Sequence, residues 1–260
     1  MDLEGDPSNH RVVVAMSGGV DSSVTAALLV EAGYEVVGLT MQLYDYGKAL
    51  QKKGACCAGS DINDARLVSS KLGIPHYVLN YESIFQDQVM NDFADSYLRG
   101  ETPIPCVRCN QTVKFTDLFD RAKNLGASAM ATGHYIRRKT KNGHLGLYTG
   151  VDPSKDQSYF LYQLKSSLLH NIEFPLGSLL KKDIRKIAEE NNLVNASKKD
   201  STGICFIGDR KYNDFVCQFL KTKKGKIITK NDIICLRPER SLSSKYYFQI
   251  LNKKFRRKFW

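Results

Sequence analysis

Hydrophobic residues in the first half of the chain form short runs that alternate with amphipathic stretches. The continuous apolar run at 11–16 is typical of a strand buried on both faces of a parallel sheet. Residues 22–32 carry apolar side chains at helical spacing and are followed by Gly33, a common helix stop. The same pattern predicts the other elements of this region: strands at 34–40, 75–79 and 129–134, and helices at 61–72 and about 113–124.

Strand and helix alternate throughout this stretch, which predicts an α/β fold with a doubly wound parallel sheet. Ligands of such folds bind at the carboxyl ends of the strands. The loops after Met16, Thr40 and Ala131 fall at those ends.

The pattern changes from Leu176 onward. An amphipathic helix at 179–191 and a polar loop at 198–203 precede short β-like pieces such as 226–229. We expect a domain boundary near residue 210. The predicted organisation is an N-terminal tail at 1–10, a large domain at 11–210, an incomplete small domain at 211–235 and a basic tail at 236–260, where disorder is expected.

Composition narrows the class of protein. Hydrophobic residues make up 42% of the chain and charged residues 25%, which is enough for a buried core. No apolar run approaches the length of about 18 residues that spans a membrane, and the N-terminus lacks a signal pattern, so we expect a cytoplasmic protein without membrane contact. The formal net charge of +11 favours a polyanionic partner, with nucleic acid the leading candidate.

The segment Ser17-Gly18-Gly19-Val20-Asp21-Ser22 lies between the first predicted strand and helix. Glycines let backbone amides approach a phosphate, the hydroxyls of Ser17, Ser22 and Ser23 are possible donors, and the helix presents its positive N-terminus. No lysine follows the glycines, so the loop differs from that of kinases and motor ATPases. A tight turn without a ligand is the alternative.

Ser-Gly-Gly-x-Asp-Ser after a buried strand resembles the pyrophosphate-binding loop (PP-loop) of the adenine-nucleotide α-hydrolase group. The resemblance implies that ATP is cleaved between its α and β phosphates and leaves AMP on an activated oxygen. It does not identify the substrate.

The seven cysteines are odd in number and loosely spaced, which argues against an extracellular disulfide framework. Cys109, beside Arg108 and near the start of the helix expected at 113, should have a lowered pKa and act as a thiolate. Cys205 lies between glycines in a loop expected to be exposed. Two reactive thiols at one nucleotide site would suit sulfur transfer.

Other interpretations of the cysteines stay open. Cys106 and Cys109 have the spacing of half a zinc site, which Cys56 and Cys57 or a histidine could complete. Cys217 lies in a short apolar helix and is expected in a core. Cys235 has no assignment.

Five segments resemble, in the same order, those of the tRNA-specific 2-thiouridylase family, over about residues 11 to 230: 15–23, 102–110, 131–135, 155–161 and 200–207. The resemblance implies that ATP, with magnesium, adenylates the C2 oxygen of the wobble uridine in tRNAs for Lys, Glu and Gln. A persulfide on Cys205 then delivers sulfur, Cys109 is the nucleophile that forms a disulfide with Cys205, and AMP and pyrophosphate leave. A sulfur-relay protein or a cysteine desulfurase would supply the sulfur.

The resemblance also assigns binding residues by position. Those implied to contact the nucleotide are Ala15, Met16, Ser17, Gly18, Gly19, Val20, Asp21, Ser22, Met41 and Gly133. Those implied to contact tRNA are Ile104, Pro105, Cys106, His134, Lys155, Asp156 and Gln157, with the first three meeting the base. No protein-bound metal is expected.

The chain departs from the family in two places. Many members carry an aspartate three residues before the first catalytic cysteine, where this chain has Cys106, a candidate to share an acid–base role. Members also continue through a small tRNA-binding domain and a β-barrel, whereas the resemblance stops near Cys235. On this interpretation 11–210 is the PP-loop catalytic domain, 211–235 a remnant of the tRNA-binding domain, and the chain is truncated.

Two other functions therefore stay open. A non-catalytic remnant would bind ATP and tRNA without releasing AMP. Another PP-loop adenylating synthetase would release pyrophosphate without needing Cys109 or Cys205.

Overall fold

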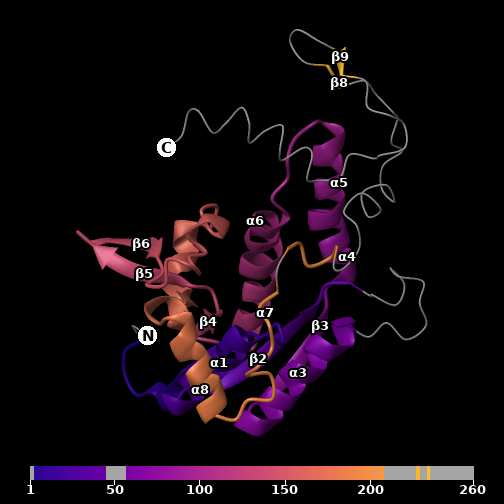
Figure 1. Ribbon diagram of the computed structural model, residues 1–260. Coiled ribbons are helices and arrows are strands. Elements are labelled where there is room, and N and C mark those ends of the chain that lie inside the picture. The colour runs from indigo at the N-terminus through magenta and orange to yellow at the C-terminus, as the bar shows by residue number, and fades with distance from the viewer. Residues whose placement is uncertain (1–2, 45–56, 202, 208–226, 229–232, 235–260) are drawn as a thin grey trace. The chain divides into compact units, whose positions relative to one another are not determined.

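The computed structural model describes residues 3–44, 57–201, 203–207, 227–228 and 233–234 (Figure 1). Contacts between residues divide the chain into two compact units. Within the described part, the first unit comprises 3–92 and 104–201, and the second comprises 93–103 and the residues after 202. The expected boundary near 210, the apolar helix with Cys217 and the tail at 236–260 lie outside the described residues.

A sheet of five parallel strands forms the centre of the first unit, in the order β3-β2-β1-β4-β7. Its strands are β1 Arg11–Ala15, β2 Glu35–Gln42, β3 His76–Asn80, β4 Ala129–Ala131 and β7 Ile172–Glu173. Every neighbouring pair is parallel, and β1 pairs with β2 on one side and β4 on the other. The predicted fold class, a doubly wound parallel sheet, is confirmed.

Helices cover both faces of this sheet. Residues of α1 Val20–Glu31, α3 Cys57–Leu72 and α8 Lys181–Glu190 pack on one face, and residues of α7 Phe119–Asn124 pack on the other. The remaining helices are α4 Glu82–Phe85, α5 Asn91–Leu98 and α6 Pro105–Cys109. Two π-helical stretches, Gln86–Met90 and Asn110–Leu118, continue α4 and α6.

The apolar run of β1 explains why both faces are covered. Val12 and Val14 pack with residues of α1, α3 and α8, whereas Val13 packs with residues of α7 and the π-helix before it. Successive side chains of a strand point to opposite faces, so a strand between two helical layers needs apolar residues at every position.

The order of the strands reverses at β1. The chain proceeds from β1 to β2 and β3 in one direction and then returns to place β4 on the other side of β1. The carboxyl ends of β1 and β4 therefore flank the point where ligands bind in doubly wound folds. The loops that start at Met16 and Thr132 leave the sheet there.

A two-stranded antiparallel hairpin, β5 Ile136–Lys141 and β6 His144–Thr149, follows β4. Four short 3₁₀ helices complete the first unit: Pro7–Asn9, Ser158–Phe160, Ser166–Asn171 and Pro175–Ser178. No helix of the described residues is long and apolar enough to cross a membrane.

Three predicted boundaries were wrong by three residues or more. The helix expected at 61–72 begins at Cys57. The helix expected from about residue 113 begins at Pro105, because proline at the first helical position loses no hydrogen bond and has a favourable φ. The strand expected at 129–134 ends at Ala131, and Thr132 makes one more bond to Glu173 O before the chain leaves the sheet.

The second unit is described only in part. The ring of Phe93 in α5 contacts Phe206 edge to face, with centroids 5.3 Å apart. Strands β8 Ile227–Ile228 and β9 Ile233–Ile234 form a short antiparallel pair, so the β-like piece predicted at 226–229 is confirmed for its two central residues.

Candidate functional site

The glycine loop between β1 and α1 depends on Gly18. Its φ of +75° lies in the left-handed region, and a Cβ there would come 2.1 Å from the carbonyl oxygen of Asp61. Gly19 is the N-cap of α1, and the nearest atom to a Cβ built there is Ser17 Oγ at 3.5 Å. Gly18 is thus fixed by the fold, whereas the backbone at Gly19 and the start of α1 can be approached.

The serines of the loop hold its shape. Ser22 Oγ and Ser23 Oγ each donate to Gly19 O at 3.0 Å, and Ser22 Oγ accepts from Ser17 N at 3.1 Å. Ser22 and Ser23 are both buried and their hydroxyl protons bond within the loop, so their donation to a phosphate stays a prediction. Ser17 is exposed.

Met16 is a core residue. Its side chain is 2% exposed, its N–H donates to Leu39 O, and its carbonyl oxygen accepts from Thr40 Oγ1. The accessible part of the loop therefore begins at Ser17. Met41 lies in β2, half-buried in the cluster on the face covered by α7.

Gly133, which follows β4, packs directly against the start of α1. A Cβ at this position would lie 3.0 Å from the backbone carbon of Asp21. The structure thus brings two of the predicted nucleotide-contacting segments together at the carboxyl edge of the sheet.

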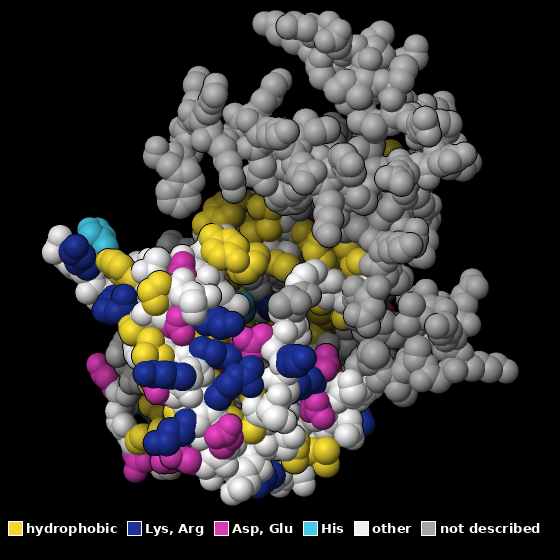
Figure 2. Space-filling view, viewed as in Figure 1, with side chains coloured by type: hydrophobic (Ala, Val, Ile, Leu, Met, Phe, Trp, Pro, Cys, Tyr) yellow, Lys and Arg dark blue, Asp and Glu magenta, His cyan; other side chains and the backbone are white. Residues whose placement is uncertain are grey.

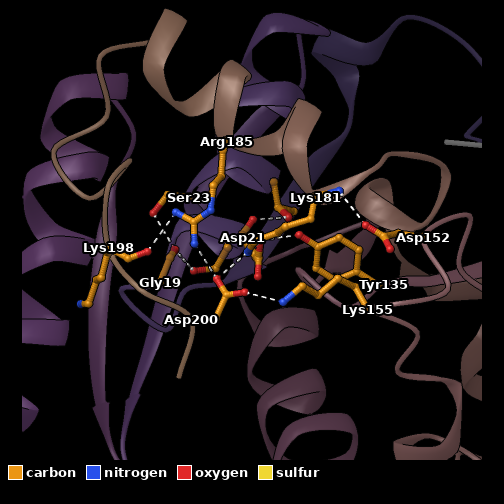
Figure 3. Close-up of polar contacts among 12 residues, drawn as sticks. Gly19, Asp21, Ser23, Tyr135, Asp152, Lys155, Lys181, Arg185, Lys198 and Asp200 are labelled. Carbon is orange, nitrogen blue, oxygen red and sulfur yellow. Dashed lines mark hydrogen bonds and ion pairs between the residues drawn. The ribbon is translucent and has the colours of Figure 1, made fainter. Parts of the chain in front are cut away.

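Asp21 is the second residue of α1 and lies at the centre of a polar network (Figure 3). Its Oδ1 accepts from the hydroxyl of Tyr135 at 2.6 Å and from Lys181 Nζ at 2.7 Å. Burial, followed by the hydrogen bond to Asp21, raises the pKa of Tyr135. Tyr135 is therefore a permanent hydrogen-bond donor to the carboxylate.

Asp200 belongs to the same network and forms ion pairs with three cations. Its carboxylate pairs with Lys155 at 2.8 Å, Lys181 at 2.8 Å and Arg185 at 2.9 Å (Figure 3). Burial alone would raise the pKa of Asp200, but hydrogen bonds from Lys155 and Lys181 lower it to about 2. Lys181 therefore bridges two carboxylates that lie far apart in the chain.

This pKa predicts how stability depends on pH. The ordinary pKa of Asp200 is 3.8 and its pKa in the folded chain is about 2, so the ion pairs stabilise the fold fully above pH 4 and lose that effect between pH 4 and 2. Asp200→Asn should lower the free energy of unfolding by about 1–3 kcal/mol at pH 7. Urea denaturation of both proteins from pH 7 to pH 2.5 should show this difference narrowing below pH 4.

The exposed Arg11–Glu35 pair provides the control. Glu35→Gln should change stability by less than about 1 kcal/mol at any pH. An Asp200→Asn difference that stays constant down to pH 2.5 would contradict the assigned pKa.

Lys198 and Asn195 form hydrogen bonds that hold the glycine loop in place. Both side chains donate to Gly18 O, at 3.1 and 2.9 Å. Lys198 also pairs with Asp61 and Asp64 of α3. The carbonyl of Gly18 is therefore turned toward the protein.

The predicted cysteine pair lies on a helix. Cys106 and Cys109 belong to α6, where Cys106 is half-buried and Cys109 is 7% exposed, and both thiols are free. Ile104, the N-cap residue, is 56% exposed, and Pro105 is buried.

The prediction of a lowered pKa at Cys109 was wrong. Burial raises the pKa of both thiols, and the charge of Lys114 opposes this only in part. Arg108 points elsewhere, with Nε donating to Gln88 O at 3.3 Å, because adjacent residues of a helix do not face each other. Sequence adjacency therefore did not place the guanidinium beside the thiol.

The segment predicted to contact tRNA forms internal contacts. Lys155 pairs with Asp200, Asp156 Oδ1 accepts from Gly150 N at 3.1 Å, and Gln157 Oε1 accepts from Tyr135 N at 3.1 Å. The segment is thereby connected to the network around Asp21.

His134 is a neutral side chain at physiological pH. Burial, with a smaller effect from the charge of Lys114, lowers the pKa of His134 to about 3. Its Nδ1 lies 2.8 Å from Thr132 Oγ1, and its ring lies against Phe115 at a centroid distance of 5.9 Å.

Cys205 belongs to the second unit, where it is exposed within the turn at 204–207. Its disulfide with Cys109 stays a prediction. Among the described residues, no group of three His, Cys, Asp or Glu side chains could hold a metal ion. Cys56 lies outside that part of the chain, so the zinc alternative stays untested.

Sequence reasoning missed Lys181, Arg185, Asn195 and Lys198. The sequence contains one signal for Lys181, its position as the first residue of α8. A cation at a helix N-terminus is unfavourable unless another contact holds it, so a lysine there indicates such a contact.

Comparison with known proteins places this chain in a family. The family model described as the tRNA methyl transferase HUP domain matches residues 10–209. Proteins named tRNA-specific 2-thiouridylase MnmA in Brucella ovis and Brucella suis biovar 1 are each 56% identical over 216 residues, which is 83% of this chain and 54% of theirs. The chain thus spans about half the length of these relatives.

Among solved structures, the U34-tRNA thiolase NcsA from Methanococcus maripaludis matches at a TM-score of 0.49 and 17% identity, over 81% of this chain and 64% of that chain. This likeness is too weak to bear on the present chain. The family model, which matches residues 10–209, and the 56% identical relatives assign the chain to a family without this structure. The chain belongs to the tRNA-specific 2-thiouridylase family.

Proposed function

We propose that this chain carries the catalytic unit of a tRNA 2-thiouridylase, a sulfurtransferase that uses ATP to replace the C2 oxygen of a wobble uridine with sulfur. One observation carries the proposal. The family match at residues 10–209 contains every residue assigned here to the nucleotide, the base or the sulfur. The relatives' name specifies tRNA as their substrate.

The loop fits the phosphates of ATP as substrate. Gly19 leaves its backbone open to approach, since the nearest atom to a Cβ built there is 3.5 Å away. The first N–H groups of α1 have no partners within the helix and attract anions. Ser17 and Gly133 lie beside this opening as further contacts, and magnesium would accompany the triphosphate.

Adenylation makes a poor electrophile reactive. A uridine carbonyl resists attack until its oxygen becomes a leaving group, and attack of that oxygen on the α phosphorus releases pyrophosphate. The terminal sulfur of a Cys205 persulfide then bonds to C2. Cys109 attacks Sγ of Cys205, which leaves sulfur on the base, forms a disulfide and allows AMP to depart.

Cys109 must lose its proton for this step. Burial raises its pKa, and Lys114 is the cation that acts against this effect. The partly buried Cys106, three residues earlier on α6, is the candidate to accept or return a proton.

The partners we propose are more specific than the tRNA that the family name states. tRNAs for Lys, Glu and Gln present the wobble uridine, and a sulfur-relay protein or a cysteine desulfurase supplies the persulfide. The target base must leave the anticodon stack to be reached, and Ile104, Pro105 and Cys106 would meet it.

The decisive experiment combines the purified chain with ATP, magnesium, an anticodon-bearing tRNA and a sulfur donor. We expect tRNA-dependent AMP release and 2-thiouridine detected by mass spectrometry of digested tRNA. Failure to form 2-thiouridine under these conditions would contradict the proposal.

A binding-only function is the second candidate, because burial raises the pKa of the Cys109 thiol and a neutral thiol is a poor nucleophile. Binding of ATP and tRNA without AMP release would support it. Pyrophosphate release that persists in Cys109→Ala and Cys205→Ala would instead indicate a different adenylating synthetase.

A further inference from the structure

The peptide bond between Gly18 and Gly19 has its carbonyl oxygen turned toward the protein. That oxygen accepts two hydrogen bonds, from Asn195 Nδ2 at 2.9 Å and from Lys198 Nζ at 3.1 Å. Every peptide bond of the described residues is trans. In a planar trans peptide the C=O and the following N–H point in opposite directions. The N–H of Gly19 therefore points away from Asn195 and Lys198.

The Gly19 N–H is open to a ligand. It donates to no other group in the part of the chain that the structure describes, and Gly19 is half-buried whereas Gly18 is buried. Gly19 is also the N-cap of α1, where the first N–H groups of a helix attract anions. A donor that already has this direction binds a phosphate without the cost of reordering the loop.

The ammonium of Lys198 has all of its donors engaged. An ammonium carries three N–H donors and no acceptor, and the acceptors around this one are Gly18 O, Asp61 Oδ1 and Asp64 Oδ2. Burial lowers the pKa of Lys198, but hydrogen bonds to the two carboxylates outweigh this effect and raise the pKa, so the side chain stays charged. Arg185 holds the adjacent backbone by donating to Lys198 O at 3.1 Å (Figure 3).

Asn195 makes the second hydrogen bond, and its amide fits in only one orientation. Its Nδ2 also donates to Ser23 Oγ at 2.9 Å, and that hydroxyl donates to Gly19 O. Because Gly18 O can only accept, a flipped amide would bring two acceptors together. The other amide atom, Oδ1, is buried without a partner among the described residues. An unpaired buried acceptor destabilises a fold, which indicates that Asn195 serves the loop and not the core.

We propose that Asn195 and Lys198 are positioning residues that hold the Gly18–Gly19 peptide with the Gly19 N–H directed at the phosphates of ATP. The inference rests on the proposed ATP-dependent function and adds to it two residues from the segment after α8. Both act through the peptide, and neither is assigned a contact with the nucleotide.

Two variants each remove one of these hydrogen bonds. Asn195→Leu removes a donor without changing the charge of the chain and also eliminates the unpaired Oδ1. Gly18 O keeps its bond from Lys198 in this variant, so it is not left unpaired. Lys198→Met removes the other donor together with one positive charge. An effect that came only from the charge of Lys198 would not be shared by Asn195→Leu.

Lys71→Met is the matched control. Lys71 is exposed and, like Lys198, donates to a backbone carbonyl, but to that of Asn192 at 2.8 Å, outside the loop. Calorimetric titration with ATP and magnesium, without RNA, gives the dissociation constant of each protein. Thermal unfolding shows whether each variant is folded.

NMR can observe the Gly19 N–H by itself. Gly18 and Gly19 are the only adjacent glycines in the chain. Glycine enriched with heavy isotopes at both the carbonyl carbon and the amide nitrogen therefore gives a single amide whose nitrogen is coupled to a labelled carbonyl, that of Gly19. We expect its proton resonance to move downfield when ATP and magnesium bind the unmutated chain, because a hydrogen bond to a phosphate oxygen deshields the proton.

Each variant should weaken ATP binding about three- to tenfold, the range expected for one hydrogen bond. The downfield displacement of the Gly19 proton at saturating ATP should also become smaller. Lys71→Met should match the unmutated chain in both measurements. A residue that only stabilised the fold would lower the melting temperature and leave the Gly19 resonance of the ATP complex unchanged.

The outcomes separate the inference from the function on which it rests. If the unmutated chain binds ATP without displacing the Gly19 resonance, or if either folded variant binds ATP as tightly, the inference fails and the function stands. Where Asn195→Leu does not fold, a normal Gly19 displacement in Lys198→Met overturns the inference. If the unmutated chain binds no ATP, the proposed function fails and the inference with it.

Discussion

Replacing Cys109 with alanine is expected to reduce 2-thiouridine formation about a thousandfold or more, while ATP still binds. In the proposed mechanism this thiol releases sulfur from a Cys205 persulfide onto the base, and on α6 only the half-buried Cys106 could form that disulfide in its place. Nucleoside analysis of digested tRNA measures the product, and calorimetry measures ATP binding. Both should be compared at a temperature where thermal unfolding shows the variant to be folded.

Companion variants sharpen this result. Cys205→Ala should lose product to the same degree, and the double variant should be no worse than either single variant, because two groups that act in one step are not additive. Cys106→Ala should slow the reaction less, as expected of a proton carrier. Normal product from Cys109→Ala would remove it from the mechanism.

Replacing Gly18 with alanine is expected to destabilise the first unit by about 3 kcal/mol or more and to abolish ATP binding. Its φ of +75° is costly for alanine, and the added Cβ would come 2.1 Å from the backbone oxygen of Asp61. Neither strain can be relieved by rotating a side chain. Urea denaturation and ATP titration provide the measurements.

The neighbouring glycine is the matched control for this clash. At Gly19, φ is −85° and the nearest atom to an added Cβ is 3.5 Å away. Gly19→Ala should therefore cost less than about 1 kcal/mol, the scale of a poorer N-cap residue. Equal stability losses in the two variants would show that the backbone at Gly18 is not constrained as described.

The sheet could be predicted from sequence because its signal is local. Each buried strand is a short apolar run that ends at a turn residue, and the alternation with helices fixes the parallel arrangement. The start of α6 could not be predicted in this way, because Pro103 and Pro105 indicate a loop unless the second proline is known to occupy the first helical turn.

The candidate site also has residues that the sequence predicts and residues that it does not. Loop residues such as Gly18 were predictable because one short segment contains the whole signal. The network around Asp21 was not, because Lys181 and Asp200 approach it only through the packing of α8 and the chain after it. The thiol pKa of Cys109 also depends on burial, which the flanking sequence does not report.

The ion pairs described above reduce how many of the 38 Lys and Arg residues are available to an RNA. Figure 2 shows Lys and Arg side chains interleaved with Asp and Glu over the lower part of the visible face. Lys155, Lys181, Arg185 and Lys198 each already pair with a carboxylate. An RNA that recruits such a cation must displace the acid, which then draws a counterion from solution and cancels part of the entropy gained by releasing ions from phosphates. The total of 38 Lys and Arg residues therefore overstates how steeply RNA affinity should fall with salt.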